Sequence, residues 1–271
     1  MAYIELQYKS MALMRGVNVT VILPTDGMAG AVPEPPYKTL YMLPGYSATA
    51  LELVTYLGLR AQAELKGMAI VIPDGENLFY QDVTQLHTFY STYVGKELVE
   101  MTRKMFPLSE KREDTYIGGI SMGGYGVLYN GMKYRDTFSK VAAFSPACDP
   151  YLMLVKEPGP GFSREQFTAL FGSKEAYLSG GCDPKTAWCE CPAQERPELF
   201  LCSGTEDRAV YKAVAQLEEA LKEAGVPHTY IEEPGDHDFY FWEGVLDRAF
   251  SFLTGIAPGT RDKLICPDRM E

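Results

Sequence analysis

The sequence predicts an α/β fold with a mostly parallel central sheet and helices on both of its faces. Strand-like and helix-like segments alternate along most of the 271 residues, which is the pattern of an α/β sheet. Several of the strand-like segments are continuous apolar runs, as expected for parallel strands that are buried on both faces. The chain is 46% apolar and 23% charged, so it can form one large domain with a substantial core.

The first half of the chain contains three predicted strands and two predicted helices. Strands are expected at residues 17–23, 38–43 and 68–72, and a turn with proline and glycine follows each of them. Helices are expected at about residues 49–66, ending at Gly67, and at about residues 89–106, ending at Pro107.

The second half continues the alternation with one interruption. Strands are expected at 115–117, 141–144, 198–202 and 228–231, and helices at 125–134, 210–224 and 240–253. Residues 149–196 break the pattern, because they are rich in glycine, proline, cysteine and aromatic residues. An insertion of this length between two strands is usually functional or locally folded. We interpret it as a cap over the carboxyl ends of the strands. The alternative is a surface subdomain that packs its own aromatic residues.

The charge and the cysteines restrict the partners and the location. A formal net charge of −11 argues against nucleic acid or an anionic membrane surface as a partner. Residues 1–6 contain no basic segment before an apolar run, and no apolar stretch is long enough to span a bilayer. With cysteine usage that fits a reducing compartment, these features predict a cytoplasmic protein. The oligomeric state, including a homo-oligomer, stays open.

The cysteines do not predict a metal site. Cys182, Cys189 and Cys191 cluster in one segment, but they lack the paired spacing of a zinc ribbon and have no histidine close in sequence. Free thiols are therefore the preferred interpretation. Cys202 lies in an apolar strand-like run and is expected to be a small core residue.

A G-x-S-x-G motif, Gly119-Ile120-Ser121-Met122-Gly123, lies between a predicted strand and a predicted helix. Small residues on either side of the serine allow a tight strand-to-helix turn to close, so that the Ser121 hydroxyl stands clear of the sheet. The N-terminus of the next helix then points free N–H groups toward developing negative charge. The motif predicts that Ser121 is a nucleophile. The alternative is a glycine-rich turn with an incidental serine.

A serine nucleophile needs a base, and the chain has only three histidines. His87 precedes the serine, whereas a serine on this kind of turn is followed in sequence by its acid and its base. His228 begins the last strand, at the wrong end of the sheet. His237 follows that strand, at the carboxyl end where α/β sheets bind ligands. We therefore expect His237 to be the base.

Ligands bind at the carboxyl ends of the strands, and this rule also indicates the carboxylate that orients the base. Asp207 is the expected residue, because it lies in the loop after the strand at 198–202. Glu206 is the second choice. Asp236 and Asp238 flank His237 too closely to orient its imidazole easily. The alternative role for Asp207 is a helix N-cap.

The oxyanion hole needs two N–H donors. One is expected from Met122, the residue after the nucleophile, and the other from the loop after the strand at 38–43. Pro44 has no N–H, and Gly45 clears space, so Tyr46 is the expected second donor. The alternative is that Pro44 and Gly45 form a plain turn.

These motifs resemble the putative esterase (esterase D) family, and within it the tributyrin esterases and feruloyl esterases. The resemblance extends from about residue 17 to residue 252 and is carried by the segments 41–46, 77–82, 119–126 and 204–207 and by the loop of His237. It implies an α/β-hydrolase fold and carboxylic ester hydrolysis, with Ser121, Asp207 and His237 as the triad. The sequence departs from the family at Pro44, where a histidine is usual, and across residues 149–196.

The motifs and the resemblance together predict a serine esterase that acts on short-chain acyl or phenolic esters of acetyl or feruloyl type. Neither a metal nor an organic cofactor is expected, and the partner is a small-molecule ester. Gly45, Tyr80 and Trp188 are candidate substrate contacts, although such aromatic residues are as often core. Two other functions stay open, namely an acyltransferase of the same superfamily and a non-catalytic binding module.

Overall fold

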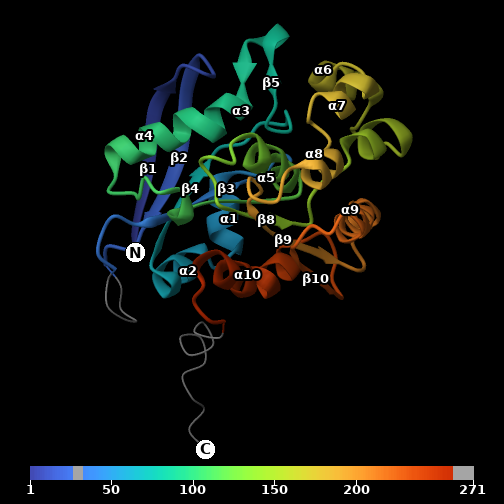
Figure 1. The fold of residues 1–271 in the computed structure, drawn as a ribbon. Coiled ribbons are helices and arrows are strands. Elements are labelled where there is room, and N and C mark those ends of the chain that lie inside the picture. Colours follow the sequence, from blue (N-terminus) through green and yellow to red (C-terminus); the bar gives the residue numbers. More distant parts are fainter. Residues whose placement is uncertain (27–32, 259–271) are drawn as a thin grey trace, which may run out of the picture.

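The computed structural model describes residues 1–26 and 33–258 and has an eight-stranded sheet at its centre (Figure 1). The strand order is β1-β2-β4-β3-β7-β8-β9-β10. The strands are β1 (Ala2–Ser10), β2 (Arg15–Leu23), β3 (Lys38–Leu43), β4 (Met68–Pro73), β7 (Thr115–Ile120), β8 (Lys140–Phe144), β9 (Glu198–Gly204) and β10 (Thr229–Glu233). The pairs β1–β2 and β2–β4 are antiparallel, and the pairs from β4 through β10 are parallel. The predicted α/β fold with a mostly parallel sheet is therefore confirmed.

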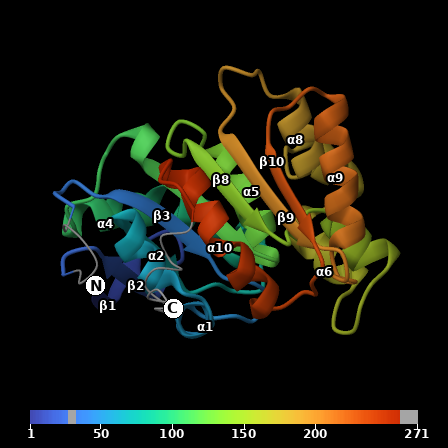
Figure 2. The same cartoon turned by 90° about the horizontal axis from the view of Figure 1, so that it is seen from below.

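Helices cover both faces of this sheet (Figures 1 and 2). One face packs against α1 (Ala50–Tyr56), α2 (Leu59–Lys66) and α10 (Phe239–Thr254), and the other against α4 (Leu98–Met105), α5 (Met122–Lys133) and α9 (Tyr211–Glu223). The helix α8 (Pro184–Glu190) packs on α5 and α9. Successive side chains of a strand point to opposite faces, so Leu40 and Met42 enter one core while Tyr41 and Leu43 enter the other. This double burial explains the continuous apolar runs of the sequence.

Two predicted helices are interrupted. The helix expected over 49–66 is split into α1 and α2, because Leu57 is extended and Gly58, a weak helix former, precedes α2. The helix expected over 89–106 consists of α3 (Tyr90–Thr92), a π-helical turn η2 (Tyr93–Glu97) and α4. The edge strand β1 was not predicted, and neither was the small hairpin of β5 (Asp82–Val83) and β6 (Thr88–Phe89), which has the 3₁₀ turn η1 (Thr84–Leu86) at its tip. A further 3₁₀ turn, η3 (Arg112–Asp114), precedes β7.

Residues 149–196, called the insertion below, contain four helical segments. They are the π-helical turn η4 (Leu152–Lys156), α6 (Arg164–Phe171), α7 (Lys174–Ser179) and α8. Its aromatic residues pack on one another, with the rings of Phe167 and Phe171 5.0 Å apart. They also pack on the main body, because Phe171 lies 6.0 Å from Tyr125 of α5 and 6.3 Å from Phe79. Among the residues described, no helix combines the length and apolar composition that a bilayer span requires.

Candidate active site

Ser121 occupies the sharp turn between β7 and α5 and adopts φ 57° and ψ −114°, a conformation that L-residues rarely adopt. Its N–H donates to the Phe144 carbonyl at 2.9 Å, which fixes the turn to the neighbouring strand. The flanking glycines have no room for a side chain. A Cβ atom on Gly119 would lie 2.4 Å from the carbonyl oxygen of Gly123, and one on Gly123 would lie 2.1 Å from that of Leu43. The two glycines of the G-x-S-x-G motif are therefore a steric requirement of this turn.

The structure brings Ser121, His237 and Asp207 together in one chain of hydrogen bonds. The Nε2 atom of His237 lies 2.9 Å from Ser121 Oγ, and its Nδ1 atom lies 2.7 Å from Asp207 Oδ2. Asp207 is buried, and its Oδ1 atom accepts hydrogen bonds from the N–H groups of Ala209 and Val210 at 3.0 and 3.1 Å. These bonds satisfy a carboxylate that would otherwise be buried at high cost.

The other acidic candidates have different surroundings. Glu206 is exposed. Asp236 accepts a hydrogen bond from the N–H of His237 at 2.7 Å, and Asp238 caps α10 by accepting one from Phe241 at 2.9 Å. Of these four candidate carboxylates, Asp207 is the one that contacts the imidazole of His237.

The two remaining histidines lie elsewhere. His87 is exposed at the end of η1. His228 precedes β10, where its Nδ1 atom lies 2.8 Å from the carbonyl oxygen of Val226. Neither histidine is hydrogen-bonded to the serine.

The loops that carry Asp207 and His237 are fastened to each other. The N–H of Thr205 donates to the carbonyl of Glu233, and the N–H of Glu206 donates to that of Gly235, both at 2.9 Å. A Cβ atom on Gly204 would lie 2.2 Å from the Gly235 carbonyl oxygen, so glycine permits this close approach. The spacing between the carboxylate and the imidazole is thus set by backbone contacts.

The loop of Pro44, Gly45 and Tyr46 faces the serine turn. A Cβ atom on Gly45 would lie 3.5 Å from the Cβ atom of Ser121, so Gly45 stands directly beside this serine. The next residue, Ser47, has a φ of 59° and is held by the side chain of Asn77. Asn77 Oδ1 accepts from the N–H of Ser47 at 2.7 Å, and its Nδ2 donates to Ser47 Oγ at 3.0 Å. No role was predicted for Asn77 from the sequence. The segment 77–82, which carries part of the family resemblance, was the feature that could have indicated one.

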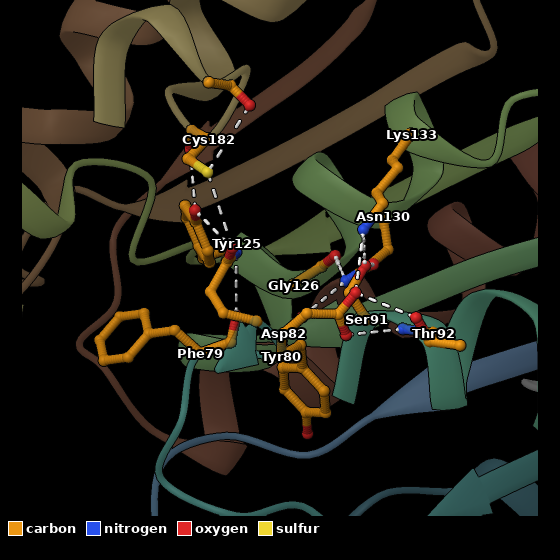
Figure 3. Close-up of polar contacts among 12 residues, drawn as sticks. Phe79, Tyr80, Asp82, Ser91, Thr92, Tyr125, Gly126, Asn130, Lys133 and Cys182 are labelled. Carbon is orange, nitrogen blue, oxygen red and sulfur yellow. Dashed lines mark hydrogen bonds and ion pairs between the residues drawn. The ribbon is translucent and has the colours of Figure 1, made fainter. Parts of the chain in front are cut away.

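Tyr80 supports this loop from inside the protein. It is fully buried, and its hydroxyl donates to the Pro44 carbonyl at 2.8 Å. Burial raises the pKa of Tyr80 well above its usual value, so the hydroxyl stays protonated and can donate. Phe79 and Tyr80 both have positive φ, and Asn130 of α5 donates to the Tyr80 carbonyl at 3.3 Å (Figure 3). The expectation that Tyr80 contacts substrate is corrected, because its side chain holds the loop and lies outside the pocket.

A pocket of about 310 Å³ opens beside the serine. It is lined mainly by apolar groups, and the lining residues are Gly45, Tyr46, Ser47, Ala48, Glu52, Leu53, Ile120, Ser121, His237, Phe239 and Trp242. The ring of Trp242 meets the imidazole of His237 edge-on at 5.1 Å, and Phe239 meets Trp242 at 5.2 Å. Sequence reasoning missed these two rings, although both follow His237 within five residues.

The expectation that Trp188 contacts substrate is also corrected. Trp188 is fully buried in α8, and its indole N–H donates to the Leu128 carbonyl of α5 at 3.0 Å. It joins the insertion to the main body and does not line the pocket. Among residues 1–26 and 33–258, no group of three or more metal-binding side chains is found, and Cys182, Cys189 and Cys191 form no disulfide.

The fold and this geometry define a serine hydrolase of the α/β-hydrolase fold. Comparison with known families gives the particular family. Residues 10–253 match the model of the family described as Putative esterase, so the chain belongs to that family and is a carboxylic ester hydrolase.

Individual relatives span nearly the whole chain. The acetyl esterase of Caldicellulosiruptor saccharolyticus is 29% identical over 270 residues, which cover 95% of this chain and 100% of that protein. The substrate-bound fluorophosphonate-binding serine hydrolase F of Staphylococcus aureus is 28% identical, with a TM-score of 0.81 and coverage of 93% and 98%. The ferulic acid esterase of Anaeromyces mucronatus, in complex with ferulic acid, is 18% identical and shares the fold, with a TM-score of 0.64 and coverage of 93% and 89%.

Proposed function

We propose that Ser121, His237 and Asp207 are the nucleophile, the general base and the orienting carboxylate of this serine carboxylesterase, which hydrolyses short-chain acyl esters and phenolic esters of acetyl or feruloyl type. The observation that carries the proposal is the unbroken chain of hydrogen bonds from the buried Asp207 carboxylate through His237 to Ser121 Oγ. This is the arrangement that activates a serine hydroxyl.

The reaction proceeds in two halves. His237 removes the hydroxyl proton of Ser121, and Oγ forms a bond to the carbonyl carbon of the ester. The tetrahedral intermediate collapses when the imidazolium, steadied by Asp207, protonates the departing alcohol. Water then enters, gives a proton to His237 and attacks the acyl-enzyme, and collapse of the second intermediate releases the acid and restores Ser121.

The negative charge on the carbonyl oxygen is stabilised by the N–H groups of Tyr46 and Met122. Met122 is the first residue of α5, so its N–H precedes the intrahelical hydrogen bonds and adds to the positive end of the helix dipole. In the part of the chain that the structure describes, no acceptor takes a hydrogen bond from either N–H. Both donors are free to bind an oxyanion, and one such donor contributes about a hundred- to a thousand-fold to kcat.

The pocket supports the choice of substrate. Its volume of 310 Å³ is at the lower end of the range of about 300–1,000 Å³ that ligand pockets occupy, which favours a short acyl chain or a single ring. The rings of Phe239 and Trp242 and the side chain of Leu53 give it an apolar wall. The acetyl esterase relative and the ferulic acid esterase of the same fold agree with this substrate range.

The insertion acts as a cap in this proposal, and its contact with the loop of Tyr46 supports that role. The amide N–H of Gln166 in α6 donates to the Tyr46 hydroxyl at 3.2 Å. The partner of the enzyme is a small-molecule ester. A cytoplasmic location is supported by the unpaired state of all five cysteines among the described residues.

The proposal is tested with the full chain, its Ser121→Ala variant and a Ser179→Ala control, which changes an exposed serine of α7. We expect a fluorophosphonate probe to label the wild type and Ser179→Ala, and not Ser121→Ala. On p-nitrophenyl acetate, butyrate and octanoate and on methyl ferulate, kcat/KM should favour acetate, butyrate or ferulate over octanoate. Full activity of Ser121→Ala would contradict the proposal, as would dominant acyl transfer to an added alcohol or sugar.

A further inference from the structure

The side chain of Tyr46 is held by the insertion. The amide N–H of Gln166 donates to the Tyr46 hydroxyl at 3.2 Å, and the ring of Phe162 meets the Tyr46 ring edge-on at 5.2 Å. Gln166 lies in the first turn of α6, and Phe162 precedes that helix by two residues. Both contacts therefore come from one short stretch of the insertion, about 120 residues further along the chain.

The other supports of the same loop come from a different part of the molecule. Tyr80 binds the Pro44 carbonyl, and Asn77 binds Ser47 on the far side of Tyr46. Both belong to the segment between β4 and β5, which α5 holds through Asn130 (Figure 3). The main body thus fixes the two ends of the loop. The Tyr46 side chain between them is held by the insertion, with one further ring contact to Phe79 of the main body at 6.4 Å.

The position of the Tyr46 ring bears on the direction of its backbone N–H. The ring is joined to the Cα atom through a single rotatable methylene, so fixing the ring restricts the backbone torsion angles at Tyr46. A displacement of about 1 Å in a catalytic group can lower the rate about a hundredfold. A contact at the end of this side chain can therefore influence the oxyanion hole.

Gln166 also carries an unusual feature for a residue of a surface helix. Its amide oxygen is buried and has no hydrogen-bond partner within the described ranges. A buried acceptor without a partner lowers stability, and such atoms in native proteins call for an explanation, of which a catalytic role is one. Stability alone would favour an apolar side chain at this position.

We infer that Gln166 is a positioning residue of the esterase, which acts through the Tyr46 hydroxyl to hold the Tyr46 N–H in the oxyanion hole. The inference rests on the proposed function, because it needs Tyr46 as an oxyanion donor. It makes the insertion part of the catalytic apparatus even for substrates too small to touch it. The oxyanion hole is then complete only when α6 is docked on the loop.

A double-mutant cycle tests this inference on the full chain with p-nitrophenyl acetate. Gln166→Met keeps the length of the side chain and removes its hydrogen bond, and Tyr46→Phe keeps the ring and removes the hydroxyl. We expect each single variant to lower kcat about tenfold, as a small misalignment of one oxyanion donor would. KM should stay within twofold. The double variant should be no slower than either single variant, because both substitutions remove the same contact.

The control is Thr168→Ala, which changes an exposed residue two positions further along α6 and should leave kcat unchanged. The inference is overturned if either single variant keeps kcat within twofold of the wild type, if the two effects multiply, or if Thr168→Ala is equally slow. Thermal unfolding checks that each variant is folded. If Gln166→Met does not fold, the kcat of Tyr46→Phe alone decides the inference. If Ser121→Ala abolishes the activity but Gln166→Met and Tyr46→Phe show no coupling, this inference is refuted and the proposed function stands.

Discussion

The hydroxyl of Tyr80 donates a 2.8 Å hydrogen bond to the carbonyl oxygen of Pro44. Pro44 has no N–H of its own, and its carbonyl belongs to the peptide unit that continues into Gly45 beside the serine. Fixing this carbonyl fixes the plane of that peptide, and with it the course of the chain toward Tyr46. A buried tyrosine thus aligns a loop in which Pro44 stands where the family usually has a histidine.

Tyr80→Phe should lower kcat on p-nitrophenyl acetate about tenfold and leave KM nearly unchanged, because the proposed oxyanion donor at Tyr46 becomes less well aligned. The variant should also lose about 1–3 kcal/mol of stability, since the buried Pro44 carbonyl loses its partner. Steady-state kinetics and urea unfolding measure the two effects. Tyr90→Phe is the matched control, because Tyr90 packs on Tyr80 at 6.0 Å and its hydroxyl bonds to Arg15, away from the loop. An equal loss of kcat in both variants would refute the assignment.

Asp207→Asn should lower kcat about a thousandfold or more, whereas Glu206→Gln should stay within twofold of the wild type. The asparagine oxygen can still accept from Ala209 and Val210, so the loop should keep its shape. Its NH₂ group would then donate to His237 Nδ1 and leave the proton on Nε2, where the imidazole cannot act as a base toward Ser121. Kinetics at neutral pH, with circular dichroism as a check on folding, decide between the two carboxylates.

The contacts among Ser121, His237 and Asp207 could be anticipated from the sequence because each residue follows a strand whose type and direction the apolar pattern reveals. Gln166, Asn77 and Trp242 could not be found in the same way. Gln166 and Asn77 act through loops whose conformation depends on contacts between distant segments. Trp188 was misassigned because sequence cannot distinguish an aromatic residue that lines a pocket from one that is buried with its N–H bonded to a backbone carbonyl.

The fold likewise contains elements that could be predicted from the sequence and elements that could not. The strand at Lys38–Leu43 was predicted with the bounds it has, because both of its faces are buried and its ends are marked by charge and by Pro44. The strand β1 was overlooked because it lies at the edge of the sheet and has only one buried residue, Ser10. At the break between α1 and α2, the N–H of Gly58 also donates a hydrogen bond to Glu243 of α10. A local sequence pattern cannot predict a hydrogen-bond partner that lies 185 residues away.

Trp242→Phe and Trp188→Phe should separate the pocket from the core. Trp242 lines the pocket and contacts His237, so its substitution should change the ratio of kcat/KM for butyrate and acetate esters severalfold. Trp188 lies in the core, so its substitution should lower the melting temperature and leave that ratio unchanged. The loss of a well-packed buried ring and its hydrogen bond typically costs about 1–3 kcal/mol. A changed acyl preference in Trp188→Phe would restore its role as a substrate contact.

The ion pair of Glu233 and Arg248 should make part of the stability depend on pH. The hydrogen bond from Arg248 holds the pKa of Glu233 below its usual value of 4.5, so the folded state favours the charged carboxylate. This contribution is present above pH 4.5 and is lost as the pH falls through the lowered pKa.

Arg248→Met should therefore reduce the free energy of unfolding by about 0.2–1 kcal/mol at pH 7, the range for exposed pairs, and the difference from wild type should vanish at acidic pH. Urea unfolding at a series of pH values measures it. In a Glu233→Gln background Arg248→Met should have no further effect of this kind. If the difference in unfolding free energy between Arg248→Met and the wild type stayed unchanged below the pKa of Glu233, the ion pair would not be the source of that difference.

Gly123→Ala should abolish esterase activity, whereas Gly244→Ala should stabilise the protein. A methyl group on Gly123 would lie 2.1 Å from the Leu43 carbonyl oxygen and 2.6 Å from that of Pro44, so α5 would have to move away from the loop that faces Ser121. Gly244 lies inside α10 and has no atom within 4 Å of an added Cβ, so alanine there gains about 0.5–1 kcal/mol from helix propensity. Activity assays and thermal unfolding of both variants test the contrast. If Gly123→Ala kept activity near that of the wild type, the close packing of α5 on this loop would not be needed to position Ser121 and the proposed oxyanion donors.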